Sequence, residues 1–263
     1  MLCTGNKKKK ITFKNYVIIN IDFVLLRQKF IYELSSQISM PNINKNDIMK
    51  KLIVKQVNIS HDGSWSEILK SLEAASWNAI DTMNWPKYSY RPQVQFRMAY
   101  CDSAFLLQYR VKEQAVRAVA TADNGEVWKD SCVEFFITPA DDGIYYNFEF
   151  NCAGTCLLSA GASRNGRESA QSALIASIRR QPSLGRHPFG ERKGETEWDM
   201  TLVIPYACLF KHPDYSPSGK IAHANFYKCG DGLTVPHFLS WHPIKTEQPD
   251  FHRPEFFGTV KFD

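Results

Sequence analysis

Two adjoining segments in which every second residue is apolar constrain the fold of this chain more than any other feature. Every second position is apolar on both sides of a turn at residues 141–143: Val133, Phe135 and Ile137 before it, and Tyr146, Phe148 and Phe150 after it. A period of two is typical of strands with one buried face, and the Asp-Asp-Gly turn joins them into a hairpin. Pairing Val133 with Phe150 places all six apolar side chains on one face. A slip by one residue would mix the two faces, so the pattern predicts this register.

The same register places Glu134 directly opposite Glu149, with Asn147 on the same polar face. Directly opposed side chains have Cβ atoms about 4.5–5.5 Å apart, and like charges at that distance are destabilising. An arginine, another cation, a shared proton or the hydroxyl groups of a ligand could offset the repulsion. Arg117 is the first candidate, because its predicted strand precedes the hairpin closely in the sequence.

The carboxylate pair permits three interpretations from the residues alone. It is an arginine-neutralised part of a polar sheet face, a ligand-binding site, or an acid/base pair or metal site. Carboxyl groups about 5 Å apart are the arrangement that a retaining glycosidase needs. A glycoside hydrolase that uses Glu134 and Glu149 is therefore the enzymatic alternative.

Most of the remaining chain from residue 90 onward also predicts short strands separated by turn-forming residues. The other predicted strands are Val94–Tyr100, Ala104–Val111, Ala115–Ala120, Thr155–Ala160, Leu174–Ile178, Trp198–Ile204, Ala222–Tyr227, His237–Trp241 and Phe256–Phe262. One helix is expected at Ser64–Ala75, with Ser64 and Glu67 forming a capping box. Many short strands with one or two short helices predict an all-β, antiparallel β-sandwich. The stretch from 160 to 171, rich in Ala, Ser, Arg and Gly, is expected to form a long loop over the sheet.

Charge divides the chain into two parts. Residues 1–50 carry nine Lys and Arg against three Asp and Glu, whereas residues 51–263 carry 23 against 24. We expect residues 1–50 to be a poorly ordered N-terminal appendage and residues 51–263 to be a single domain. The domain lacks the basic excess that binds phosphate backbones, so no nucleic-acid partner is expected. Asp22 interrupts the apolar run of residues 16–26, which is too short to span a bilayer, so no membrane partner is expected either.

The seven cysteines show no metal-binding or disulfide framework spacing, which makes a zinc ribbon improbable. Free thiols favour a reducing compartment. Turn residues rich in oxygen atoms, Asp123, Asn124, Asp141 and Asp142, could hold a structural calcium ion, although they are also common turn formers. No other cofactor is expected, and the identity of any metal stays open.

At the hairpin the sequence resembles a known family. The run from Val127 to Ile137 is similar to the Trp-x-Asp-x-x-Val-Glu signature of family-9 carbohydrate-binding modules, here Trp128 to Glu134. The segments Leu239–Trp241 and Pro249–Gly258 resemble the closing motif of the family. The resemblance covers roughly residues 76–263. Family-9 modules are appendages of bacterial xylanases. The resemblance implies a jelly-roll-like β-sandwich that binds sugars in polysaccharide catabolism without hydrolysing them.

The resemblance also implies a set of sugar-binding residues. Two aromatic rings clamp a terminal sugar in the family, and their positions fall on Trp128 and near Phe251 here. The signature Glu134 binds sugar hydroxyl groups. The position of an assisting arginine on the next strand falls on Glu149, so a carboxylate replaces a cation, and Phe251 replaces a tryptophan.

We therefore expect non-catalytic binding of plant-type oligosaccharides or polysaccharide ends, such as xylan or cellulose fragments, by a monomer. The predicted ligand-binding residues are Trp128, Glu134, Phe251, Glu149, Arg117 and Asn147. An aromatic ring covers the C–H face of a pyranose while carboxylates and amides bond its hydroxyl rim. An interaction module that has lost the sugar site is a third interpretation. Localisation is not assigned, because the family favours an extracellular protein and the free cysteines favour a cytoplasmic one.

Overall fold

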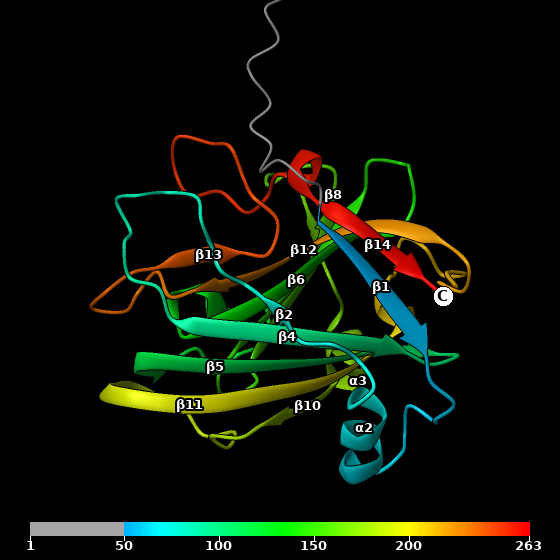
Figure 1. Ribbon diagram of the computed structural model, residues 1–263, viewed down its shortest axis with the longest axis horizontal. Coiled ribbons are helices and arrows are strands. Elements are labelled where there is room, and N and C mark those ends of the chain that lie inside the picture. Colours follow the sequence, from blue (N-terminus) through cyan, green and yellow to red (C-terminus); the bar gives the residue numbers. More distant parts are fainter. Residues whose placement is uncertain (1–49) are drawn as a thin grey trace, which may run out of the picture. The chain divides into compact units, whose positions relative to one another are not determined.

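The computed structural model describes residues 50–263, which form two layers of strands with a core between them. The expected appendage, residues 1–50, lies outside the described residues except for Lys50. In one layer the strands follow the order β10 (Arg179–Pro182), β11 (Phe189–Pro205), β5 (Ala104–Ala118) and β4 (Gln93–Tyr100), with β2 (Asn78–Ala79) beside β4 (Figure 1). No helix in the described part of the chain is long and apolar enough to cross a membrane.

The second layer contains the hairpin that the alternation predicts. Its strands follow the order β14 (Gly258–Phe262), β12 (Ile221–Cys229), β6 (Cys132–Thr138), β7 (Tyr145–Asn151), β8 (Cys156–Gly161) and β9 (Glu168–Ser169). Two short strands, β13 (Phe238–Ser240) and β3 (Thr82–Met83), extend it beside β12. Figure 1 shows β12, β6 and β13 above the layer of β4, β5 and β11.

Strand β1 (Lys51–Gln56) joins the two layers into one curled sheet. Residues 51–54 pair with β14, and residues 55–56 pair with β4, in both cases in parallel. The other strand pairings within residues 50–263 are antiparallel. The predicted all-β sandwich is therefore confirmed, with β1 as a parallel link that the sequence does not reveal.

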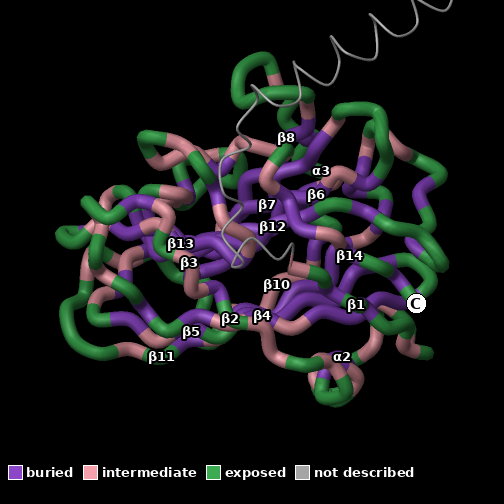
Figure 2. Tube along the Cα trace, turned by 45° about the horizontal axis from the view of Figure 1, so that its top comes forward, coloured by how far each residue is buried: buried purple, intermediate pink, exposed green. Residues whose placement is uncertain are grey.

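Aromatic side chains fill the space between the layers. The ring of Phe96 on β4 stacks on Phe226 of β12 with centroids 3.7 Å apart, and Phe105 of β5 meets Phe135 of β6 edge to face. All six alternating apolar residues of the β6–β7 hairpin belong to this core, as the pattern predicts. Figure 2 shows the buried segments of β6, β7 and β12 gathered at the centre of the domain.

The capped helix is confirmed, and it ends three residues earlier than expected. Helix α2 (Trp65–Leu72) begins after Ser64, whose hydroxyl group accepts the Glu67 amide while the Glu67 carboxylate accepts the Ser64 amide at 2.8 Å. This reciprocal arrangement satisfies two amides that a helix start leaves unpaired. Ile68 and Leu72 pack against the outer face of β4 and β5.

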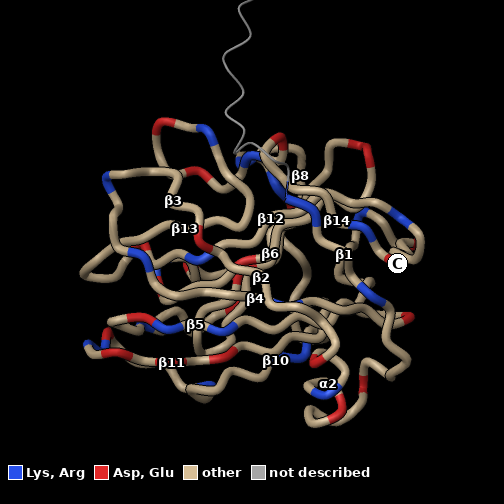
Figure 3. The backbone as a smooth tube through the Cα atoms, in the orientation of Figure 1, with Lys and Arg blue, Asp and Glu red and all other residues tan. Residues whose placement is uncertain are grey.

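Two strand predictions are wrong. Residues 174–177 of the predicted strand Leu174–Ile178 form the last part of helix α3 (Ser172–Ser177). An apolar run this short has no periodicity that separates helix from strand. The second wrong prediction concerns residues 104–111 and 115–120, for which the sequence predicts two strands. The structure has one continuous strand, β5, from Ala104 to Ala118. Its polar middle is paired: Lys112 forms ion pairs with Glu195 and Glu197 on β11, at 2.8 and 3.1 Å. Figure 3 shows basic and acidic residues interspersed along β5 and β11.

Three short 3-10 helices complete the described secondary structure: η1 (Val127–Lys129), η2 (Tyr206–Cys208) and η3 (Pro254–Phe256). The expected loop over the sheet lies between β8 and the short strand β9, and then leads into α3. Helix η1 comes directly before β6, and the segment leading into η3 contains Phe251, so both segments of the predicted motifs border the same layer.

Candidate functional site

The β6–β7 hairpin presents two glutamates on the face turned away from the main core. Glu134 pairs with Glu149 across the strands, and Phe136 pairs with Asn147, in the predicted register. Only 2% of Glu134 and 4% of Glu149 is exposed. The alternation explains this placement, because the flanking apolar residues turn toward the core and leave the glutamates on the other face.

Burial raises the pKa of both carboxyl groups. The pKa of Glu134 lies well above its usual range, because burial and the Glu149 charge both disfavour ionisation. Burial raises the pKa of Glu149 to about 7. The Cys229 thiol lies 3.0 Å from Glu134 Oε1, and Asn147 Nδ2 donates to Glu149 Oε1 at 2.9 Å. Near neutral pH the pair therefore retains a proton, and it offers a ligand both a donor and acceptors.

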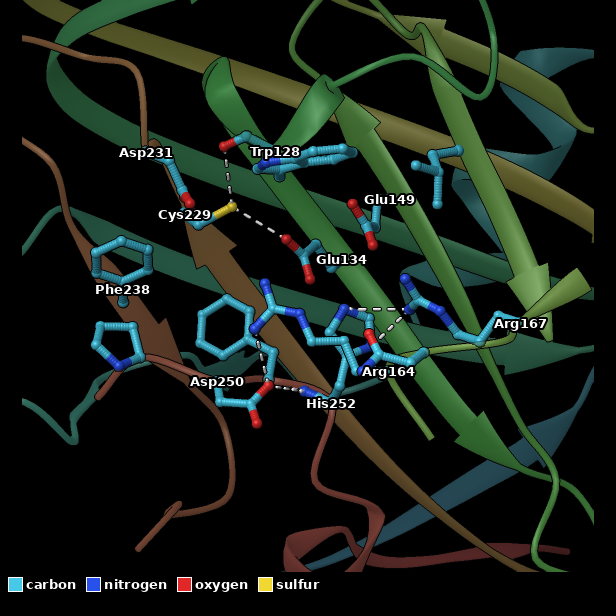
Figure 4. Close-up of a pocket in the computed structure, with 14 residues that line it drawn as sticks. Trp128, Glu134, Glu149, Arg164, Arg167, Cys229, Asp231, Phe238, Asp250 and His252 are labelled. Atoms are coloured by element: carbon cyan, nitrogen blue, oxygen red, sulfur yellow. Dashed lines mark hydrogen bonds and ion pairs between the residues drawn. The ribbon is translucent and has the colours of Figure 1, made fainter. Parts of the chain in front are cut away.

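These carboxyl groups form one wall of a pocket of about 240 Å³. Trp128 on η1 and Phe238 on β13 line it as well, and the segment before η3 contributes Phe251. Figure 4 shows the Trp128 ring beside Glu134 and Glu149. The volume is below the roughly 300–1,000 Å³ of pockets for drug-sized ligands, so it suits a single small ring.

Trp128 is a half-buried side chain on a well-anchored backbone. Val127 beside it is fully buried, and the Trp128 carbonyl accepts the Asp231 amide at 3.2 Å. These contacts hold η1 against the end of β12. The indole ring is thus presented to the pocket by a rigid support, as its predicted role requires.

Phe251 is more buried than Trp128 and packs in an aromatic cluster. Its ring stacks on Tyr227 with centroids 4.1 Å apart and an interplanar angle of 6°, and the Tyr227 hydroxyl group donates to the Phe251 carbonyl. Trp85 and Phe238 pack around the same ring. Phe251 lines the pocket as expected, but Tyr227 covers one of its faces.

Comparison with known proteins now identifies the family. The family model described as "Carbohydrate-binding family 9" matches residues 64–262. The chain belongs to carbohydrate-binding family 9. A putative carbohydrate-binding protein from Bacteroides uniformis is 45% identical over 81% of this chain and 99% of its own, with a TM-score of 0.79. A search of curated proteins finds no match.

A second solved structure shows the same fold at low identity. It is a family 9 module from Caldicellulosiruptor kristjanssonii in complex with cellotriose, 14% identical over 81% of this chain and 93% of its own, with a TM-score of 0.50. At this identity the likeness supports the sandwich fold alone. The family match covers residues 64–262, where the resemblance predicts roughly residues 76–263.

Arg117 lies outside the pocket of this family 9 domain, so its predicted role beside the glutamates is wrong. Its guanidinium group forms an ion pair with Asp130 at 3.2 Å and donates to the Gly232 carbonyl. Asp130 is fully buried and also accepts the amides of Val119 and Ala120. Because β5 lies in the opposite layer, Arg117 ties η1 to the end of β5 instead of reaching the hairpin face.

Asn147 also does not line the pocket, although it is on the expected face. It is fully buried and its amide holds Glu149 by the hydrogen bond given above. The structure thus places Trp128, Glu134, Glu149 and Phe251 in one pocket, with Asn147 as a positioning residue behind it.

The basic residues of the family 9 pocket, Arg164 and Arg167, come from the loop between β8 and β9. Figure 4 shows them on the side away from Trp128, near Asp250 and His252. Arg164 lies 3.4 Å from Asp250, and Arg167 donates to His252 Nδ1 at 2.6 Å. Burial and the arginine charges lower the pKa of His252 to about 3, so its imidazole ring is neutral.

The sequence predicts this loop over the sheet but does not assign its arginines to the site. The pairing of β8 with β7 carries the loop beside Glu149. The charge of Arg167 lowers the pKa of both glutamates, without a hydrogen bond from a basic side chain to either carboxyl group among residues 50–263. Cys229 and Asp231 at the end of β12 also line the pocket unpredicted.

Three of the four turn residues suggested for calcium, Asp123, Asn124 and Asp142, have protein partners. Arg180 forms an ion pair with Asp123 at 2.8 Å, and Asn124 accepts the Leu158 amide and donates to the Ala170 carbonyl. Asp142 accepts the Ile144 amide and contacts His212. These contacts fit the role of turn formers, and calcium at these turns stays a prediction.

Proposed function

We propose that the pocket binds the terminal unit of a plant-type polysaccharide, such as a xylan or cellulose fragment, without cleaving it. The observation that carries the proposal is the placement of the Trp128 ring beside the paired carboxyl groups of Glu134 and Glu149 in a pocket of about 240 Å³. Trp128 would cover the C–H face of a pyranose, and the carboxyl groups would bond its hydroxyl rim.

The partly protonated state of the carboxyl pair suits a neutral sugar. A sugar hydroxyl group is both donor and acceptor, and a pair that shares a proton offers both functions in return. The small volume accommodates a chain end better than the interior of a chain, because a longer glycan would need an open groove. The cellotriose bound to the Caldicellulosiruptor module, a distant member of the same family, supports a glucan fragment as the ligand class.

Isothermal titration calorimetry with glucose, xylose, cellobiose and xylobiose tests the proposal. We expect heat with at least one of these sugars, and Trp128→Ala should weaken its binding by about tenfold or more, because stacking and ring burial are lost. Trp77→Ala is a matched control: Trp77 is also half-buried, but it stacks under Arg97 and Arg110 on the other layer. No heat with any of the four sugars from folded wild-type protein would contradict sugar binding and favour a module that has lost its site.

Glycoside hydrolysis is the second candidate, favoured by the two carboxyl groups with raised pKa in one pocket. A hydrolase would use the protonated Glu134 as the acid and the ionised fraction of Glu149 as the nucleophile. Turnover of aryl glycosides that disappears in Glu134→Gln would establish it. Sugar binding without turnover would leave the non-catalytic proposal standing.

A further inference from the structure

Two residues of the pocket wall, Glu134 and Cys229, belong to a cluster of thiol and carboxyl groups that sugar binding does not explain. Cys132 and Cys229 face each other directly across β6 and β12. Glu134 is two residues beyond Cys132 and therefore on the same face of β6. One sulfur of each cysteine and one carboxylate oxygen of Glu134 all lie within 4.8 Å of one another, and all three residues are buried.

We propose that Cys132, Glu134 and Cys229 bind a thiophilic divalent cation of the zinc class. In a tetrahedral zinc site with Zn–S and Zn–O distances near 2.3 and 2.0 Å, ligand atoms are roughly 3.5–3.8 Å apart. No separation in the cluster exceeds this spacing by more than about 1 Å, and the Cys229 sulfur lies 3.0 Å from Glu134 Oε1, so small side-chain adjustments would reach the zinc geometry. Two thiolates and one carboxylate are a ligand set that selects zinc or cadmium over calcium or magnesium.

The thiol of Cys229 is surrounded by more hydrogen-bond acceptors than its single S–H group can bond. Its sulfur lies 3.0 Å from Glu134 Oε1 and 3.5 Å from the Trp128 carbonyl oxygen. Figure 4 shows the carboxyl group of Asp231, an exposed residue, beside the same thiol, and its interaction with Cys229 lowers the pKa of Asp231. A metal ion in this position would bond several of these groups at once, whereas one S–H group can donate only one strong hydrogen bond.

Basic side chains in the described part of the chain do not occupy this position. Lys228, next to Cys229, points to the opposite face and forms an ion pair with Glu113 at 3.0 Å. Arg164 and Arg167 make their contacts with Asp250 and His252 across the pocket. A divalent cation would supply the positive charge that the buried carboxyl pair lacks at hydrogen-bonding distance.

The proposed site has three fixed ligands and a position open to the pocket. The strands supply Cys132, Glu134 and Cys229, while Asp231 or a water molecule would complete the tetrahedron from the pocket side. Such a site does not depend on sugar binding, and it can be tested without any sugar.

The test is titration of the reduced, metal-free full chain with cadmium chloride. Binding is monitored by the thiolate-to-metal charge-transfer absorption. We expect the band to saturate at one cadmium per chain, zinc to displace it, and zinc to raise the melting temperature. Cys132→Ser and Cys229→Ser should each abolish the band. Cys208→Ser is the matched control, because Cys208 is equally buried but lies at η2.

Glu134→Gln provides a second measurement that leaves both thiols in place. It should weaken cadmium binding by about tenfold or more, because one charged ligand is lost. Absence of the band from folded, reduced wild-type protein would overturn the proposal, as would a band that persists in both single cysteine variants. Neither result would bear on sugar binding, which the calorimetry measures separately.

Discussion

Glu134 lies directly opposite Glu149 on neighbouring strands, and both carboxyl groups are almost fully buried. Such a pair is expected to be costly when both members are ionised, because like charges repel and burial disfavours each charge. The structure offsets this cost with a retained proton, with the Asn147 and Cys229 hydrogen bonds, and with the more distant charge of Arg167.

Stability should fall as the pH rises through neutrality because of this pair. Both carboxyl groups bind their protons more tightly in the folded than in the unfolded chain, where the pKa of Glu is near 4.5. Their stabilising contribution is therefore complete below about pH 4.5 and is lost as the pH rises through about 7 for Glu149.

Glu149→Gln should remove much of this pH dependence. At about pH 8 the variant should be more stable than wild type by roughly 1–3 kcal/mol, and near pH 4.5 the two should be equal. Urea denaturation across this pH range measures the difference. Glu126→Gln, which alters an exposed residue, should follow the wild-type curve, and a Glu149→Gln variant that did so too would contradict the pKa assignment.

Arg167 and Arg117 should differ in their influence on the pocket. Arg167→Ala should raise the pKa of Glu149 and of His252, because the Arg167 charge lowers both. Arg117→Ala should leave both pKa values unchanged and cost roughly 1–3 kcal/mol of stability, because the buried Asp130 loses its partner. Carboxyl and histidine NMR titrations measure the pKa values. A shift of the Glu149 pKa in Arg117→Ala would restore the role first predicted for Arg117.

The buried ionic group formed by Lys228, Glu113 and His237 should be critical for the stability of the fold. The Lys228 ammonium group lies 3.0 Å from Glu113 Oε2 and 2.8 Å from His237 Nε2, and Trp198 donates to the other Glu113 oxygen at 2.7 Å. Lys228→Met should cost about 3–5 kcal/mol, because Glu113 stays buried without its counter-charge. In the double variant with Glu113→Gln, part of this loss should be recovered. Chemical denaturation of wild type and the two variants measures these differences, and equal stability of the single and double variants would argue against the coupling.

The glycine of the closing motif should be sensitive to substitution for a steric reason. A Cβ atom on Gly258 would lie 2.5 Å from the Trp241 ring and 2.9 Å from the Lys50 carbonyl oxygen. Gly258→Ala should therefore lower stability by roughly 1–3 kcal/mol. Gly190→Ala is the control, because no atom lies within 4 Å of its added Cβ. Thermal unfolding of both variants is the measurement, and equal melting temperatures would contradict the steric argument.

The parts of this protein that the sequence predicts are those with a strong local pattern. The β6–β7 register follows from alternation around a short turn, since a slip by one residue would mix the apolar and polar faces of the hairpin. The capping box of α2 follows from two residues three positions apart. The short apolar run at Leu174–Ile178 carries no such pattern, so its sequence predicts a strand where the structure has a helix.

Local sequence alone placed Glu134 and Glu149 side by side, but only the tertiary structure decided what surrounds them. Cys229 and Asp231 reach the pocket because β12 pairs with β6, and Arg167 reaches it because β8 pairs with β7. Arg117 is nearer to Glu134 in sequence than any of these residues, yet it pairs with Asp130. The physical reason is that pairing within a hairpin depends on adjacent residues, whereas the neighbours of a hairpin depend on strand order and packing across the whole chain.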